Sequence, residues 1–169
     1  MAIFETERLK ARRLGIKDSD GMHAIYGDLE TVRYVGDSQP LNTEQCQLWV
    51  EITDKNFEKR GYGMIALEHR ETGDLIACAG IVHPDQQEEP ELKYAIRRDH
   101  WGKGYATETG RGLLQHARAN WGLTRIIATV FPENLDSQKV LAKLGFKHAL
   151  DRPNDDGSVT QVWESLEPL

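Results

Sequence analysis

The most constraining feature of this 169-residue sequence is a predicted strand that runs through two closely spaced glycines into a predicted helix. The strand covers residues 91–97, and the glycines are Gly102 and Gly104. Glycine lets a ligand approach the backbone closely, and the first turn of a helix carries unpaired N–H groups at the positive end of its dipole. This order of elements predicts a phosphate-binding loop, with Lys103 as a nearby counter-charge.

Three kinds of phosphate loop share this outline, and residue spacing separates them. A Walker loop requires a glycine five residues before Gly102 and a serine or threonine after Lys103, and the sequence has neither. A dinucleotide loop prefers glycine or alanine at position 107 and an acidic residue about 20 residues later. The sequence instead has Thr107 and then the apolar run 126–130, so that match is weak.

The third kind is an acyl-CoA loop. Residues 101–106, Trp-Gly-Lys-Gly-Tyr-Ala, resemble the Gln/Arg-x-x-Gly-x-Gly/Ala pattern of the GCN5-related N-acetyltransferase (GNAT) family. Further along the chain, Asn134, Ser137 and the Gly-Phe pair at 145–146 are similar to the family's Asn-x-x-Ser/Ala helix. The patterns at 5–9 and 101–108 look most like the RimJ/RimL-like branch, which acetylates the N-terminal amine of ribosomal proteins. Both motifs stand in the family's order, and the resemblance spans nearly the whole chain.

The resemblance implies an α/β fold in which one GNAT domain covers residues 1–169. A mixed central sheet of about seven strands is expected to splay at the acyl-CoA site, with helices on both faces. Hydrophobic periodicity and turn residues agree with this order. They predict strands at 9–14, 62–68, 75–82, 91–97 and 125–130 and a final hairpin within 146–163. They predict helices at 16–26, 29–34, 104–121 and 136–144, and another between Asn42 and Gly61.

The resemblance also implies that acetyl-CoA binds as a co-substrate and that no metal is needed. The pantetheine arm is expected to pair with the backbone of Tyr94, Ala95 and Ile96, and the pyrophosphate with the loop and the first helical turn. Asn134 is expected to bond the pantetheine arm, although an asparagine there also suits a helix N-cap. Trp101 stands where the family has Gln or Arg, and packing is its more ordinary role. The full set of expected cofactor residues is Tyr94, Ala95, Ile96, Trp101, Gly102, Lys103, Gly104, Tyr105, Ala106, Thr107, Asn134 and Ser137.

Acetyl transfer to an amine requires a base, because an alkylamine with a pKa near 10.4 is almost wholly protonated at pH 7. Glu91 matches the glutamate of the family's Glu-x-Gly-Tyr pattern, and we expect it to act as the general base through a water molecule. Two alternatives stay open. Glu88 or Glu89 in the same acidic run can take that role, or Glu91 is only a solvated surface charge.

The family's usual proton donor for the departing thiolate cannot be carried over to this sequence. Many family members use a tyrosine seven residues after the asparagine, and this sequence has Leu141 there. Ser137 is the remaining hydroxyl in range, and it equally suits a first-turn helix position. Lys93 replaces the glycine of Glu-x-Gly-Tyr. It either lowers the pKa of Glu91 or points to the opposite face of the strand.

Composition limits the classes of partner and the cellular location that we expect. The net charge is −6 and the sequence pI is about 5.5, which disfavours nucleic-acid binding and suits a cationic acceptor, although an acidic balance also simply favours solubility. No apolar run approaches the roughly 20 residues that span a bilayer, and no secretory signal is evident, so we expect a cytoplasmic protein. Cys46 and Cys78 alone suggest neither a disulfide framework nor a zinc site.

These observations predict an N-acetyltransferase that transfers the acetyl group directly in a ternary complex. A protein N-terminal α-amine is the first acceptor candidate, and a small cationic amine such as a polyamine or an aminoglycoside is the second. A non-catalytic acyl-CoA sensor is the alternative from another class, because the tyrosine is missing and Lys93 is present. Homodimers are common among folds of this type, but the sequence establishes neither the oligomeric state nor the acyl-chain preference.

Overall fold

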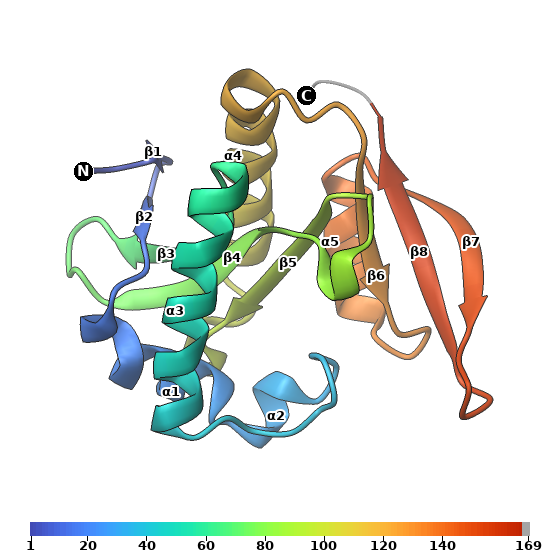
Figure 1. The fold of residues 1–169 in the computed structure, drawn as a ribbon, viewed down its shortest axis with the longest axis horizontal. Helices are drawn as coiled ribbons and strands as arrows, with labels where there is room; N and C mark the ends of the chain where they lie inside the picture. The colour runs from blue at the N-terminus through green and yellow to red at the C-terminus, as the bar shows by residue number, and fades with distance from the viewer. Residues whose placement is uncertain (167–169) are drawn as a thin grey trace.

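The computed structural model describes residues 1–166 and arranges their strands in one eight-stranded sheet, ordered β1-β2-β3-β4-β5-β6-β8-β7 (Figure 1). Residues 167–169 of the expected domain lie outside the described residues. Neighbouring strands are antiparallel apart from the parallel pair β5 and β6. The strands are β1 (Phe4–Glu5), β2 (Leu9–Arg13), β3 (Met64–His69), β4 (Leu75–Val82), β5 (Glu91–Ile96), β6 (Ile126–Val130), β7 (Lys147–Pro153) and β8 (Val159–Ser165).

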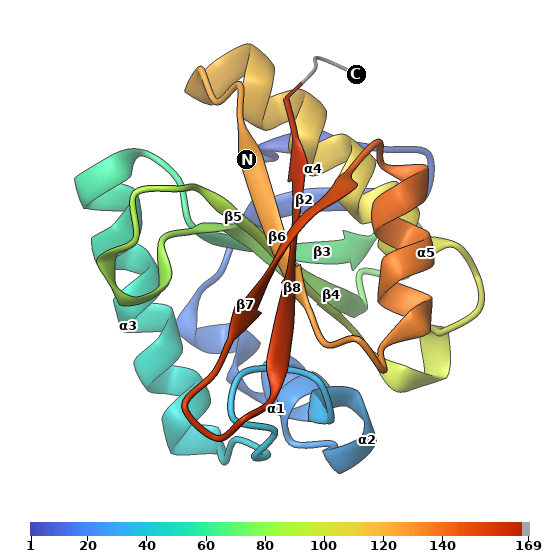
Figure 2. The ribbon, with the colours of Figure 1, turned by 90° about the vertical axis from the view of Figure 1, so that its right-hand side faces the viewer.

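Helices cover both faces of this sheet. On one face, Ala66, Cys78 and Ala95 pack against residues of α1 (Ser19–Tyr26), α2 (Leu29–Val32) and α3 (Thr43–Arg60). On the other face, the larger apolar cluster includes side chains of α4 (Tyr105–Trp121) and α5 (Leu135–Lys143). Figure 2 shows α3 on one side of the strands and α4 with α5 on the other.

The predicted fold class is confirmed: the sheet is mixed, and helices lie on both of its faces. The structure has one strand more than the seven expected. The additional strand is β1, which has only two residues and pairs at the sheet edge with Ala11 and Lys10. A strand of two residues shows no alternation of polar and apolar positions, and sequence periodicity therefore does not reveal it.

Local sequence explains the bounds of the longest helix. The Asn42 side chain accepts a hydrogen bond from the Gln45 N–H, and the Gln45 side chain accepts one from the Asn42 N–H, both at 2.8 Å. This reciprocal cap satisfies two N–H groups that a helix start leaves unpaired. Gly61 ends α3 in the left-handed region, with φ of 80°.

β4 lies near the middle of the sheet and is buried over almost its whole length. Gly80 in this strand pairs with Met64 of β3 and Lys93 of β5. A Cβ at position 80 would lie 2.6 Å from Met64 Cα and would also meet the Gly63 backbone. Because Gly80 has no side chain, the backbone at Gly63 and Met64 can lie close to β4.

Gly80→Ala is therefore expected to lower the free energy of unfolding by about 1–3 kcal/mol, because the added methyl group must displace backbone. Urea denaturation of the two proteins measures the difference. Gly15→Ala is the matched control, since Gly15 has φ of −134° and its Cβ would meet no atom closer than 3.9 Å. Equal effects of the two substitutions would contradict the packing argument.

Candidate active site

The parallel strands β5 and β6 part soon after they meet. Glu91 and Ile127 are the one pair in register between them, and the Ile127 N–H donates to the Pro90 carbonyl at 2.9 Å. The remainder of β5 is paired on its other side with β4, as far as Ile96 with Ala77. Figure 1 shows the two strands separating toward their ends. The expected splay is thus present, and beyond Glu91 the edge of β5 that faces β6 has no strand partner among the described residues.

Strand alternation sends the side chains of β5 to opposite faces of the sheet. Ala95 packs in the cluster with α1, α2 and α3, and Glu91 and Lys93 share that face by their spacing of two residues. Leu92 and Tyr94 pack with the cluster on the α4 and α5 side. The open strand therefore presents a carboxylate and an ammonium on one face and a phenol on the other.

The glycine loop joins β5 to α4. Gly102 and Gly104 have φ of 72° and 81°, a region that side chains disfavour, and residues 101–104 are exposed. A Cβ at position 102 would meet no described atom within 4 Å. The positive φ values explain why glycine stands at both positions. The space over Gly102 is open to a ligand at the start of α4.

Trp101 ties this loop to the end of β5. Its indole Nε1 donates a hydrogen bond of 2.8 Å to the Ile96 carbonyl, while 45% of the residue stays exposed. The bond gives Trp101 an anchoring role within the loop. Its exposed ring surface remains free for contact with a ligand.

A pair of residues that sequence reasoning missed, Arg8 and Glu108, holds the loop from the N-terminal side. Arg8 Nε donates to Glu108 Oε2 at 2.7 Å, and Arg8 Nη1 donates to the Lys103 carbonyl at 2.9 Å. Thr6 Oγ1 donates to Glu108 Oε1 at 2.7 Å, and the Arg8 guanidinium lies 4.0 Å above the ring of Tyr105. Burial raises the pKa of Glu108, but the bonds from Thr6 and Arg8 outweigh burial and hold that pKa below its ordinary value.

A groove of about 730 Å³ opens beside the same loop, along the outer side of α4. Its lining carries both signs of charge, with Arg8, Arg111 and Lys143 as cations and Glu5, Glu7 and Glu108 as anions. The groove lies next to Gly104 and Thr107, whereas Glu91 does not line it. It extends the exposed glycine loop toward the second half of α4.

Glu91 is only 2% exposed, and its carboxylate has three donors. Gln87 Nε2 donates to Oε1 at 3.1 Å, and Thr129 Oγ1 donates to Oε2 at 2.9 Å. Lys93 Nζ lies 2.5 Å from the same Oε2 atom. The alternative in which Glu91 is a solvated surface charge is therefore wrong, and Lys93 does not point to the opposite face.

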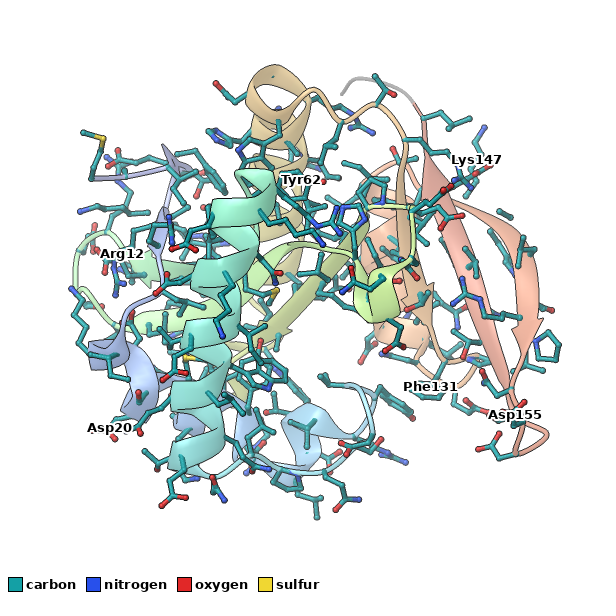
Figure 3. The ribbon with its side chains drawn as sticks, in the orientation of Figure 1. Arg12, Asp20, Tyr62, Phe131, Lys147 and Asp155 are labelled. Atoms are coloured by element: carbon teal, nitrogen blue, oxygen red, sulfur yellow. The ribbon has the colours of Figure 1, made fainter. Side chains whose placement is uncertain are left out.

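The segment before Glu91 is itself fixed by hydrogen bonds. His83 Nδ1 lies 3.0 Å from the Gln87 carbonyl, and His83 Nε2 lies 2.8 Å from the hydroxyl of Tyr62, which follows the C-terminal end of α3 (Figure 3). A carbonyl only accepts, so Nδ1 carries the proton and Nε2 accepts from Tyr62. Both ring nitrogens are thereby engaged. His83 fixes the position of Gln87 and, through it, the carboxylate of Glu91.

Asn134 and Ser137 lie together at the start of α5. The Asn134 side chain accepts from the Ser137 N–H at 3.2 Å, which is the N-cap geometry. Ser137 Oγ lies 2.7 Å from the Tyr94 hydroxyl, and the two hydroxyls share one hydrogen bond. Burial raises the pKa of the Tyr94 phenol, and the bond with Ser137 acts in the opposite direction. Leu141 is 1% exposed in the core cluster, so this position presents no group to the gap.

Comparison with known proteins agrees with this geometry. A family model described as an acetyltransferase (GNAT) domain matches residues 8–147. The chain belongs to the GNAT acetyltransferase family. An uncharacterized N-acetyltransferase p20 of Bacillus licheniformis is 30% identical to this acetyltransferase over 149 residues, which cover 87% of this chain and 83% of that protein. The family inferred from the two motifs is thereby confirmed.

Solved structures show the same fold at low identity. RimL, a ribosomal L7/L12 α-N-protein acetyltransferase in complex with coenzyme A, superposes with a TM-score of 0.84 at 12% identity, covering 99% of both chains. MccE, a microcin C7 self-immunity acetyltransferase in complex with acetyl-CoA and AMP, gives a TM-score of 0.79 at 10% identity, covering 96% of this chain and 94% of that one. The structural neighbours thus include the branch that the sequence patterns resemble.

Among residues 1–166, no helix is both long enough and apolar enough to cross a bilayer. Within the same residues, His, Cys, Asp and Glu side chains form no group of three arranged to hold a metal ion. Cys46 and Cys78 are both free thiols in the interior.

Glu108→Gln is expected to destabilise the protein by about 1–3 kcal/mol at pH 7, because it removes the charge that Arg8 pairs with. The difference from the native protein should shrink as the pH falls below 4.5, the ordinary value, and vanish below the lowered pKa of Glu108, where the native carboxyl is also neutral. Thermal unfolding across pH measures it. Glu7→Gln, an exposed charge in the same segment, is the control, with an expected change under about 0.5 kcal/mol. A constant difference down to pH 2 would contradict the role of the charge.

Proposed function

We propose that this acetyltransferase moves the acetyl group of acetyl-CoA to a primary amine, first of all a protein N-terminal α-amine. The observation that carries the proposal is that β5 presents polar side chains on both faces of the sheet at the point where β6 separates from it. Glu91 faces the side of α1, α2 and α3, and Tyr94 meets Ser137 on the side of α5. A base for the nucleophile and a hydroxyl pair for the leaving group then lie on opposite sides of one gap.

The chain offers suitable contacts for acetyl-CoA. The exposed loop 101–104 and the first turn of α4 provide N–H groups for the pyrophosphate, with Lys103 beside them. The edge of β5 at residues 94–96 is not paired with β6 and suits the amides of the pantetheine arm, with the Ile96 carbonyl already bonded to Trp101. Bound there, acetyl-CoA supplies an activated acyl group and a thiolate leaving group. Asn134 would contribute its amide N–H groups, since its oxygen already caps α5.

In this proposal, Glu91 is the general base that accepts a proton from the incoming amine. An α-amine has a pKa near 7.7 to 8.0 and loses its proton far more readily than an alkylamine with a pKa near 10.4. This difference favours a protein N-terminus, and so does the shared fold with RimL. A main-chain N–H within residues 94–96 is the proposed donor to the oxyanion, because it is fixed before the reaction begins.

A small cationic amine is the second acceptor candidate. The net charge of −6 attracts cations, and MccE shows that this fold also occurs in an acetyltransferase crystallised with a nucleotide. Acetyl-CoA-dependent thiol release, measured across N-terminal peptides, polyamines and aminoglycosides, separates the two. Turnover confined to one class identifies the acceptor. Thermal stabilisation by acetyl-CoA without any turnover would instead support a non-catalytic sensor.

Glu91→Gln is expected to lower kcat by about 10²- to 10⁴-fold, the usual contribution of a general base, while acetyl-CoA still stabilises the protein against heat. The amide keeps the size of the carboxylate but cannot take the proton. Glu89→Gln is the matched control, because Glu89 belongs to the same acidic run. A loss confined to the Glu89 variant would move the base to that residue.

Ser137→Ala and Tyr94→Phe are each expected to slow turnover by about tenfold, below the usual contribution of an acid, because a thiolate leaves readily. If the two hydroxyls act as a pair, the double variant should lose little more than either single variant. Steady-state rates with one peptide acceptor measure this. Additive losses would show that the hydroxyls act separately.

A further inference from the structure

Lys93 occupies an unusual place beside the proposed base. Its ammonium lies 2.5 Å from Glu91 Oε2, and it approaches from the same face of β5. The Glu91 side chain is 2% exposed, whereas 41% of the Lys93 side chain is exposed. The Lys93 amine therefore lies between the buried Glu91 carboxylate and the solvent.

An acceptor amine needs two things: hydrogen-bond contact with the base, and a position on the face of β5 that the base serves. Lys93 meets both conditions, because its amine contacts Glu91 and its backbone lies just beyond the last pair between β5 and β6. We propose that Lys93 is itself an acetyl acceptor, so that the enzyme acetylates its own active-site lysine. This inference rests on the proposed function, since it uses the same acetyl-CoA and the same base.

The reaction follows ordinary aminolysis of a thioester. Glu91 takes one proton from the Lys93 ammonium, and the neutral Nζ attacks the thioester carbonyl carbon. A C–N bond forms as the C–S bond breaks, and the second proton of the nitrogen passes to the departing thiolate. The products are Nζ-acetyl-Lys93, coenzyme A as its thiol and one proton, which Glu91 returns to water.

Acetylation would change the electrostatics around Glu91. The product amide carries no charge, so the carboxylate loses its only close cation among the described residues. Gln87 and Thr129 remain as donors to it. Oε2 is then free to contact an external ammonium in place of Lys93. The modified protein is thus the form whose base is open to an acceptor in solution.

The test uses the purified full-length protein, incubated with acetyl-CoA and mapped by peptide mass spectrometry over time. We expect acetylation at Lys93 to proceed at least about tenfold faster than at Lys103, an exposed lysine of the cofactor loop that lies away from Glu91. Glu91→Gln should slow labelling of Lys93 by about 100-fold and leave labelling of Lys103 unchanged. Lys93→Arg keeps a cation beside Glu91 and should abolish the fast acetylation, leaving only labelling at the slow rate of Lys103.

Labelling of Lys93 at the rate of Lys103, or no labelling of Lys93, would overturn the inference. Two parallel measurements on the same sample separate this failure from failure of the proposed function. If acetyl-CoA stabilises the protein and a peptide amine is acetylated while Lys93 is not, only the inference on Lys93 fails. If neither the peptides and small amines nor Lys93 are acetylated, both proposals fail.

Discussion

The candidate active site depends on the early separation of β5 and β6. Two parallel strands normally satisfy each other's backbone groups along their length, and here the pairing is limited to Glu91 and Ile127. On the edge of β5 that faces the gap, Trp101 satisfies the Ile96 carbonyl, and a backbone group with no such partner needs water or a ligand, because unpaired buried groups are costly. A linear ligand with its own amides can complete the strand. The gap is therefore the place that we propose for the pantetheine arm, because β5 lacks a strand partner there.

The neighbouring strand keeps this opening in place. β4 pairs with β5 from Val82 to Ala77, and Gly80 lets Met64 of β3 lie close on the opposite edge of β4. β6 is held in turn by β8 along its whole length. Each side of the gap therefore belongs to a paired and buried part of the sheet. The separation of the strands is therefore set by the pairing of β5 with β4 and of β6 with β8.

Much of this arrangement could be predicted from the sequence, because it depends on local patterns. Glycines in the left-handed region at 102 and 104 agree with a loop that must turn before a helix, and alternation favours the first of the two positions left open for Lys93, the one on the face of Glu91. The contacts of Arg8 with Glu108 join residues 100 apart, and residue spacing carries no signal for such a pair. The role of Gln87 was missed for another reason. It depends on the path of the segment between His83 and Glu91, where Asp85 has φ of 51°.

The pairing of Arg8 with Glu108 also links the N-terminal segment to the glycine loop that we propose for the coenzyme. Thr6 and Arg8 contact the first turn of α4, and Arg8 reaches the carbonyl of Lys103 within the loop. Any ligand that orders this loop must also favour the attached N-terminal segment, and by reciprocity the segment must favour the ligand. Coenzyme binding should accordingly shield residues near position 8 from proteases. A bulky fusion at the N-terminus would weaken coenzyme binding from outside the site.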